Sequence, residues 1–541
     1  MPSRLSKIGG GFWIKTHIEV KNYLCYYKIV ILKKVFHKLA QIKILHFSLV
    51  LSCIFFAAAL INILNHEMWR DEFQGWLLAR DSETIGDLFR NTRYEGHPIL
   101  WHLGLFFIGK ITHNPFFMQI YHLLIATGVV FILARYSPFT RLQKFLFSFG
   151  YYPLYEYAAI SRNYSISLLL MFATCAIYRS GRANRYIYLA IVLFLLAHTS
   201  IYGLVFMICF TGYFFLDTVF NAQKRQWASG KKVQCLLAVL IVFIGAATSL
   251  MQIIPPPDSG YAVEWHTEWN NQRLVSVIGV VYKAFVPIPV NELHFWETNI
   301  VLSQGACLWL SVALLIICSM VLARSPLVLL LFLGGTAGLL AFMYVKYFGF
   351  QRHHGHLFIL LVISLWLAGD QLKRDGKRPG IQSLAHGLTV TRYIFITLLL
   401  AANVYAGILS SCLEWKYDFS MGKAAAKYIK ENGLDKELWA GHQDYAVTSV
   451  CGYFAKKVYY PRSNREGSFI IFNNKREPIE SKHALALIKE YAKDKWQDTI
   501  LILNFKPRRR KHRNIQLIKS FEGCVVLNEE FYICKPKAKS R

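Results

Sequence analysis

Charged residues are scarce in this chain. Only 17% of its 541 residues are Asp, Glu, Lys or Arg, whereas 54% are hydrophobic and the mean hydropathy is +0.32. A soluble protein of this size carries roughly a quarter charged residues. The composition therefore excludes an ordinary soluble enzyme, a disordered chain, a coiled coil and a collagen-like chain. With 39 Phe, 30 Tyr and 13 Trp, it is typical of a polytopic membrane protein whose aromatic residues meet lipid and headgroups.

Acidic residues are scarcer than basic ones. The chain has 32 Asp and Glu against 61 Lys and Arg, a net charge of +29. Such an excess could indicate nucleic acid, but the basic residues gather in the N-terminal segment and in short gaps between apolar runs. Residues 1–44 contain a single acid, Glu19. This distribution marks the cytoplasmic side of a membrane protein, so we expect membrane lipids and no nucleic acid as partners.

The eleven cysteines form no Cys-x-x-Cys pair and no Cys/His spacing typical of zinc sites. A disulfide framework and a zinc module are therefore excluded. The chain also lacks an Asp-x-Asp motif. We expect no bound metal or cofactor, and the alternative is a divalent ion held by His66, Glu67 and Glu95 together with Asp71.

Apolar runs predict about eleven transmembrane helices. The shorter run Pro98–Ile111 is predicted to lie at the interface, because counting it as a span would put basic loops on both sides of the membrane. Residues 23–44 interleave lysines with apolar residues and predict an amphipathic helix on the cytoplasmic surface. The predicted spans lie near residues 45–64, 115–134, 142–160, 164–179, 185–199, 200–217, 233–254, 300–322, 326–347, 354–370 and 391–411.

This topology puts four basic segments in the cytoplasm and two long loops, 65–114 and the Pro-rich 255–299, on the outer side. The four basic segments are Arg135–Lys144, Arg179–Arg185, Lys224–Lys232 and Lys373–Arg378.

After about Leu413 the composition changes, because charged residues become common and helix-like stretches alternate with short strand-like runs. Alternation of this kind predicts a small α/β domain. The expected organisation is a basic cytoplasmic segment (1–44), a transmembrane domain (45–411) and a soluble extracytoplasmic α/β domain (412–541). Without an obvious disulfide framework in that domain, we expect a bacterial inner membrane, with the domain in the periplasm. The predicted helices are Gly422–Asn432 and Ser481–Lys493, and the predicted strands are Glu437–Ala440, Lys457–Tyr460, Thr499–Leu503 and Phe531–Cys534.

The first outer loop is the richest in chemistry. Asp71 and Glu72 follow the first predicted span, a surface helix is predicted at Ser82–Arg90, and Glu95 and His97 come next. A carboxylate at the membrane interface can deprotonate an acceptor hydroxyl. The alternative is that these charges only end a membrane helix.

Two further polar clusters are predicted on the outer side. Arg162 and Tyr164 form a turn at the start of a span, and Arg352 precedes another span with three histidines, His353, His354 and His356. Arginine suits bidentate contact with phosphate, and histidines can add hydrogen bonds. Interfacial anchoring of these side chains is the alternative. His353 and His356 are spaced to share one helix face.

The motifs in these loops resemble those of the GT-C superfamily of integral-membrane glycosyltransferases, in its protein O-mannosyltransferase and aminoarabinose-transferase branch. The resemblance covers roughly residues 45–411 in layout. Members of the family often carry two prolines in the histidine motif, where this chain has Pro98-Ile99. The motifs that carry the resemblance are Asp71-Glu72, Gly96-His97-Pro98, Ser161-Arg162-Asn163-Tyr164 and His198-Thr199.

The resemblance implies a GT-C fold and an inverting transfer of one sugar from a polyprenyl-phosphate donor to a glycan, lipid or protein acceptor on the outer face. By analogy, Asp71 is the general base, and Glu72 adjusts its pKa or binds substrate. The expected substrate-binding residues are Glu95, His97, Arg162, Tyr164, Arg352, His353, His354 and His356.

Other functions stay open. A glycan ligase with a polyprenyl-pyrophosphate donor would use similar arginines and histidines. A lipid or glycolipid transporter would have discontinuous helices and polar residues at the midplane. A non-catalytic scaffold would leave Asp71, Arg162 and Arg352 apart in space, so their convergence is the discriminating observation.

The loop 255–299 and the run Lys506–Arg513 have two interpretations each. Aromatic and acidic residues such as Trp265 and Glu268 suit sugar stacking or lid movement, and an interfacial aromatic belt is the alternative. The basic run suits anionic lipid or an acidic glycan, and a solvated charged surface is the alternative.

Overall fold

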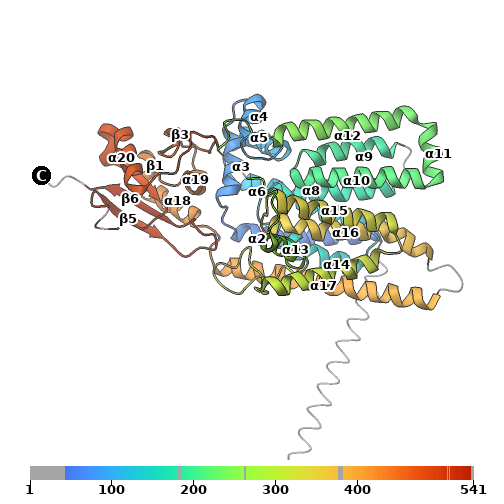
Figure 1. Ribbon diagram of the computed structural model, residues 1–541. Coiled ribbons are helices and arrows are strands. Elements are labelled where there is room, and N and C mark those ends of the chain that lie inside the picture. Colours follow the sequence, from blue (N-terminus) through green and yellow to red (C-terminus); the bar gives the residue numbers. More distant parts are fainter. Residues whose placement is uncertain are drawn as a thin grey trace, which may run out of the picture.

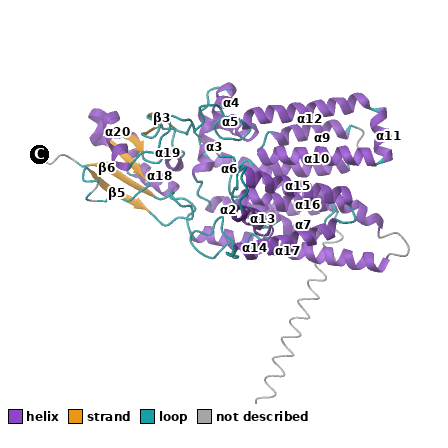
Figure 2. Ribbon diagram, viewed as in Figure 1, coloured by secondary structure: helices purple, strands orange, loops and turns teal. Residues whose placement is uncertain are grey.

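The computed structural model describes residues 43–180, 184–260, 264–375, 382–508, 510 and 512–537. It is mostly helical, with a small sheet near the C-terminus (Figures 1 and 2). The long helices form one elongated bundle, and the sheet region lies at one end of it. The expected mostly helical architecture with a C-terminal sheet is thereby confirmed. The amphipathic helix predicted at residues 23–44 lies almost wholly outside the described residues.

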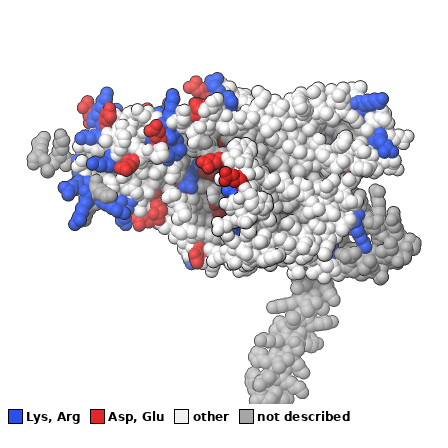
Figure 3. Space-filling view, viewed as in Figure 1, with Lys and Arg blue, Asp and Glu red and all other residues white. Residues whose placement is uncertain are grey.

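Within the described ranges, seven helices are long and apolar enough to cross a membrane. Their surfaces are apolar on several sides, as expected where lipid replaces water. Figure 3 shows a broad band almost free of charge along the bundle, with Lys and Arg at the end far from the sheet. The seven are α2 (Ile44–Asn65), α6 (Phe116–Tyr136), α10 (Ile201–Phe220), α12 (Lys232–Ile253), α14 (Gln304–Leu322), α15 (Pro326–Val345) and Val390–Lys416 of α17 (Gln382–Lys416).

The other four predicted spans correspond to helices that are short, broken or polar at their start. α8 (Tyr164–Arg179) and α9 (Arg185–Ala197) are shorter than 18 residues, and α16 (Gln351–Asp375) begins with polar residues. The span predicted at 142–160 is not one continuous helix. That segment forms α7 (Arg141–Ser148) and then a π-helical turn, η1 (Tyr151–Glu156), because Pro153 lacks the N–H that a continuous α-helix needs.

The segment 255–299, predicted as an outer loop between spans, has helical structure that the sequence analysis did not predict. It contains α13 (Asn271–Phe285), whose first turn is capped by the Asn270 side chain accepting from the Arg273 N–H at 2.9 Å. Its apolar residues recur at helical spacing, and Val277, Val281 and Phe285 are buried, with α13 packed against α14 and α16. The flanking prolines and polar residues hid this helix in the sequence.

The segment 65–114, predicted to be the first outer loop, folds into three helices: α3 (Arg70–Asp81), α4 (Ile85–Thr92) and α5 (Leu100–Ile111). α4 corresponds to the surface helix predicted at Ser82–Arg90 and starts with a Thr84–Asp87 capping box. α5 packs against α3.

The C-terminal sheet has six strands in the order β3-β2-β1-β4-β6-β5. β1 is parallel to β2 and to β4, and the other pairs are antiparallel. Both predicted helices and all four predicted strands are present, whereas β3, β5 and α19 were not foreseen. α17 continues to Lys416, past the predicted boundary at 411/412. The elements are α18 (Gly422–Glu431), β1 (Leu438–Gly441), α19 (Asp444–Cys451), β2 (Val458–Tyr460), β3 (Arg465–Gly467), α20 (Ser481–Ala492), β4 (Thr499–Leu503), β5 (Ile515–Phe521) and β6 (Phe531–Pro536).

α3 connects the two parts of the molecule. It lies between the bundle and the sheet region (Figure 1), and its buried Phe73 and Trp76 belong to one hydrophobic core with Val447 and Val450 of α19. A Cβ added at Gly452 would approach Phe73 to 2.0 Å, so the contact is close. The helix that carries Asp71 is therefore packed from both sides.

Candidate active site

Asp71 lies in the first turn of α3. The helix begins after Trp69, whose backbone N–H donates to Glu72 Oε2 at 3.2 Å. Acidic residues in a first turn are stabilised by the helix dipole. The side chain of Asp71 keeps 31% of its area exposed, so a substrate can reach the carboxylate.

Two arginines from distant parts of the chain meet this carboxylate. Arg162 Nη1 lies 2.8 Å from Asp71 Oδ2, and Arg352 Nη2 lies 3.6 Å from the same oxygen. Arg162 comes from the turn before α8, and Arg352 from the first turn of α16. The three residues therefore converge, as the glycosyltransferase hypothesis requires and the scaffold hypothesis does not.

Arg352 is enclosed by aromatic rings and a second carboxylate. Its guanidinium carbon lies 5.6 Å from the Trp69 ring, 5.4 Å from Trp296 and 4.7 Å from Phe350. Its Nη1 pairs with Glu297, and its buried Nε has no hydrogen-bond partner. Cation–π contact and ion pairing fix the side chain. Its Nε–H remains available as a charged hydrogen-bond donor.

The acidic and imidazole groups around Asp71 differ in charge state. Burial raises the pKa of Asp71, but the charges of Arg162, Arg352 and Arg70 and the hydrogen bond from Arg162 together outweigh it, so the net pKa is lowered. Burial raises the pKa of Glu95 and of Glu297 to about 7 each. At neutral pH, Asp71 is therefore ionised, while these two carboxyls are close to their midpoints.

Glu95 and His97 lie beside this cluster. Gln74 Nε2 donates to Glu95 Oε1 at 2.7 Å, and Gly96 between them has a φ of +66°, a conformation that favours glycine. Burial lowers the pKa of His97 to about 3, and the nearby Arg162 adds to this effect. His97 is thus neutral, and its buried Nδ1 has no partner, which leaves it free to bind a substrate.

Glu72 does not join Asp71 in the open site. Its side chain is fully buried, with His66 Nε2 2.8 Å from its Oε2 and the Ser161 N–H donating to its Oε1 at 2.6 Å. His66 in turn contacts Glu414 at 2.5 Å. Both Glu72 oxygens are therefore occupied, and the geometry makes Glu72 a positioning residue that ties α3 to the turn carrying Arg162.

The three predicted histidines of α16 occupy different environments. The Phe350 N–H donates to His353 Nδ1 at 2.9 Å, and His353 Nε2 lies 2.8 Å from the Tyr164 hydroxyl. His354 Nε2 instead contacts the Phe348 carbonyl at 3.0 Å. The rings of His353 and His356 both pack against Tyr164, which confirms their shared face.

His356 lies deeper and stacks on Tyr202 at 4.5 Å between ring centroids. Among the three histidines, His353 is thus linked to the site through Tyr164, while His354 and His356 serve the packing of α16. In the described part of the chain, no group of three or more His, Cys, Asp or Glu side chains could hold a metal ion. His66, proposed in the metal alternative, bridges Glu72 and Glu414 instead.

The four resemblance motifs lie together although they are far apart in sequence. Hydrogen bonds within or close to the motifs hold these segments together. These bonds run from Ser161 N–H to Glu72 Oε1 (2.6 Å), from Asn163 Nδ2 to the Thr199 carbonyl (2.7 Å) and from Leu100 N–H, next to the Gly-His-Pro motif, to the His198 carbonyl (3.2 Å).

The sequence did not predict Glu297 or Trp296 as parts of the site. Glu297 has a φ of +65°, which is uncommon for a residue with a side chain and marks positions held by their surroundings. A conformation of this kind leaves no signal in a single sequence. The carboxylates and aromatic residues of the 255–299 loop were the available hint.

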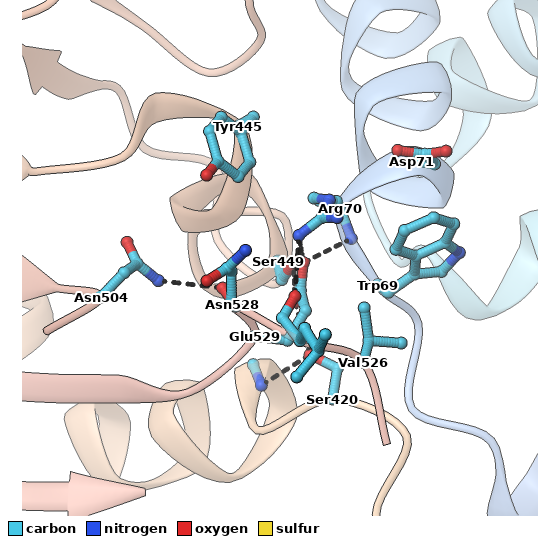
Figure 4. A network of polar contacts seen from close by, with 12 residues as sticks. Trp69, Arg70, Asp71, Ser420, Tyr445, Ser449, Asn504, Val526, Asn528 and Glu529 are labelled. Atoms are coloured by element: carbon cyan, nitrogen blue, oxygen red, sulfur yellow. Dashed lines mark hydrogen bonds and ion pairs between the residues drawn. The ribbon is translucent and has the colours of Figure 1, made fainter. Parts of the chain in front are cut away.

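The sequence also gave no hint of Glu529, which joins the sheet region to α3. Figure 4 shows it between Arg70, Ser420 and Ser449. Its Oε1 accepts from the Arg70 N–H at 3.2 Å, and its Oε2 accepts from Ser420 Oγ at 2.7 Å and Ser449 Oγ at 2.5 Å. Arg70 Nη1 also donates to the Leu527 carbonyl at 3.2 Å. The residue before Asp71 is therefore fixed by the sheet region.

No protein-family model matches the chain, and no match was found among the curated proteins.

Proposed function

We propose that this chain is an inverting glycosyltransferase of the GT-C type. It moves a single sugar from a polyprenyl-phosphate donor to an acceptor on the outer face of the membrane. The observation that carries the proposal is the contact of one partly exposed carboxylate, Asp71, with two arginines, Arg162 and Arg352, from separate elements. A general base and a phosphate-binding pair are the two parts that this reaction needs.

In the proposed reaction, the two arginines bind the phosphate of the donor. This phosphate competes with Asp71 for the guanidinium groups, so donor binding frees the carboxylate. Asp71 then takes the proton of the acceptor hydroxyl, and that oxygen attacks the anomeric carbon of the sugar. The bond from this carbon to the phosphate oxygen breaks, and polyprenyl phosphate leaves with the electron pair, stabilised by Arg162 and Arg352.

The remaining parts of the site support this chemistry. Tyr164 and His353 lie beside Arg162 and Arg352 in sequence, and Glu95 and neutral His97 can hydrogen-bond sugar hydroxyls. We further propose eleven membrane passes in a bacterial inner membrane, with the site and the sheet region in the periplasm. The basic residues at the far end of the bundle (Figure 3) then face the cytoplasm.

The broken segment α7–η1 favours a second candidate, a lipid or glycolipid transporter, because discontinuous helices are common in transporters. Transport of a fluorescent polyprenyl-phosphate-sugar analogue into proteoliposomes that also contain membrane extract as acceptor separates the two functions. A transporter moves the analogue without making a glycosylated product, and a transferase transfers its sugar to the acceptor without net transport.

The test of transfer uses the purified full chain in lipid with radiolabelled polyprenyl-phosphate sugars and membrane extract as acceptor. We expect Asp71→Asn to lose about 100-fold or more of the transfer rate, because a general base contributes roughly that much. Glu83→Gln, an exposed carboxylate in the same loop, is the matched control. An Asp71→Asn protein that binds donor and transfers at the wild-type rate would contradict the proposal. Transfer only from pyrophosphate donors would indicate the ligase.

A further inference from the structure

An open groove of about 970 Å³ lies outside the Asp71 cluster, at the start of α13 and α14 and just beyond the end of α15. Its volume falls in the upper part of the range of ligand sites, about 300–1,000 Å³. Its wall combines aromatic, amide and carboxylate side chains. The ones that matter here are Glu264, Trp265, Glu268, Trp269, Gln272 and Arg273.

We propose that this groove binds a carbohydrate chain, and that the acceptor of the transferase is therefore a neutral or amino-bearing glycan. The identification of the bound glycan as the acceptor rests on the proposed function, whereas carbohydrate binding itself does not.

Two exposed tryptophans carry the first part of the argument. Trp265 is 68% exposed and Trp269 is 74% exposed. A large rigid ring with a polar N–H provides broad contact at a low cost in conformational entropy. Sugar rings present flat faces of C–H groups that match such surfaces. Trp269 Nε1 donates to Asn271 Oδ1 at 2.6 Å, which fixes the orientation of its ring.

The segment that carries both tryptophans is held in place. Its backbone and side chains are bonded to the last turn of α15, so the rings are positioned before any ligand arrives, which reduces the entropy cost of binding. The His266 N–H donates to the Val345 carbonyl (2.8 Å), and Arg273 Nε donates to the Tyr344 carbonyl (2.6 Å). The Tyr344 hydroxyl donates to the Glu268 carbonyl (2.8 Å) and accepts from the Asn270 N–H (2.7 Å).

The charge of the wall selects among glycans. Glu264 and Glu268 line the groove together with Arg273, and Lys346 Nζ lies 4.3 Å from the centroid of the Trp265 ring, so the charges at the groove balance. The carboxylates and amides suit hydrogen bonds with the hydroxyl and amino groups of a glycan, whereas a chain of uronic acids would bring its own carboxylates against Glu264 and Glu268. The groove therefore suits neutral and amino sugars.

The groove is connected to the Asp71 cluster through the turn before α16. Phe348 lines the groove and its ring packs on His354 at 5.3 Å between centroids. Two residues later, the Phe350 ring lies 4.7 Å from the guanidinium carbon of Arg352. One short turn thus forms part of the groove wall and also contacts the proposed phosphate-binding arginine.

Binding is measured on the full chain in lipid nanodiscs by tryptophan fluorescence and by saturation-transfer NMR. The probes are chito-oligosaccharide, chitosan oligosaccharide, malto-oligosaccharide and, as an acidic comparison, oligogalacturonide. We expect at least one neutral or amino-bearing probe to bind and the acidic probe not to bind. Trp265→Ala and Trp269→Ala should each weaken binding by about tenfold, and Trp309→Ala, an exposed tryptophan on α14, should leave it unchanged.

Three outcomes would overturn the proposal. These are no binding by any neutral or amino probe, binding that both substitutions leave unchanged, and strong quenching of Trp265 and Trp269 by brominated lipid, which would make them membrane anchors. Asp71→Asn separates this proposal from the proposed function. Glycan binding that persists in a chain without transfer activity under any condition supports the groove and removes only the acceptor role.

Discussion

The carboxylate of Glu529 accepts a hydrogen bond from the backbone N–H of Arg70, at 3.2 Å, directly before Asp71. Glu529 belongs to the C-terminal sheet region and Arg70 starts α3. The same carboxylate binds Ser420 and Ser449, so one buried group orders the entry into α3 and two segments of the C-terminal part.

This relationship predicts that Glu529→Ala lowers both stability and transfer. The substitution leaves the Arg70 N–H and two hydroxyls without their acceptor, at a cost of about 1–3 kcal/mol. We expect the transfer rate at saturating donor to fall more than the donor affinity, because α3 is displaced while the arginines remain. Glu530→Gln is the control, and Glu529→Gln should recover part of the rate. Equal losses of rate and affinity would argue for general unfolding.

Arg352→Lys should weaken donor binding by about 10–100-fold, because a lysine replaces the planar fork that contacts phosphate and packs between aromatic rings. Isothermal titration with polyprenyl phosphate measures the effect. Arg93→Lys, at an exposed position in the first outer loop, should have no effect. Unchanged donor affinity in Arg352→Lys would remove Arg352 from the phosphate site.

Arg162→Gln should shift the pH dependence of transfer. The pKa of Asp71 is lowered because the charges of Arg162, Arg352 and Arg70, with the hydrogen bond from Arg162, together outweigh the opposing effect of burial. Removing Arg162 favours the neutral carboxyl, so the pKa of Asp71 rises and the acid limb of kcat/KM moves to higher pH. A rate profile from pH 4 to pH 8 checks this. If the acid limb of the kcat/KM profile does not shift, the ionisation of Asp71 does not determine that limb.

Stability should fall as the pH rises from about 5 to 8. Burial raises the pKa of Glu95, Glu297 and Glu529 to about 7 each, above the ordinary value of an exposed glutamate. Groups of this kind contribute stability below their unfolded-state pKa and lose it as the pH rises through the folded-state pKa. The melting temperature, measured at a series of pH values, should fall between about pH 5 and pH 8, and Glu297→Gln should make this fall smaller. A melting temperature that rises toward pH 8 would contradict the expectation.

The sequence was informative where local pattern decides structure. The long apolar helices and the predicted strands of the C-terminal region followed from hydropathy and alternation, whereas the convergence of Asp71, Arg162 and Arg352 was left as a question that the structure answers. Helix α13 was missed because prolines on both sides suggested a loop. Strand β5 was missed because most of its residues are exposed, which weakens the hydrophobic signal.

Glu297 and Glu529 could not be identified in advance for a different reason. Each reaches its partner from a loop whose position is set by the packing of helices and strands far away in the chain. A single carboxylate in a loop has no periodicity and no fixed spacing to its partner. Glu72 shows the same limit, because the sequence indicated an active carboxylate and the fold buries it against His66 and Ser161.

Because they share a core at α3, the helical bundle and the C-terminal sheet region depend on each other. Phe73 packs on Tyr453 and shares a hydrophobic core with α19, so a chain cut after α17 would uncover this aromatic side chain two residues after Asp71. The two halves are therefore not interchangeable parts. Grafting the C-terminal half of another protein onto this bundle would require a matching surface for α3, and evolution can alter either half only while preserving that fit.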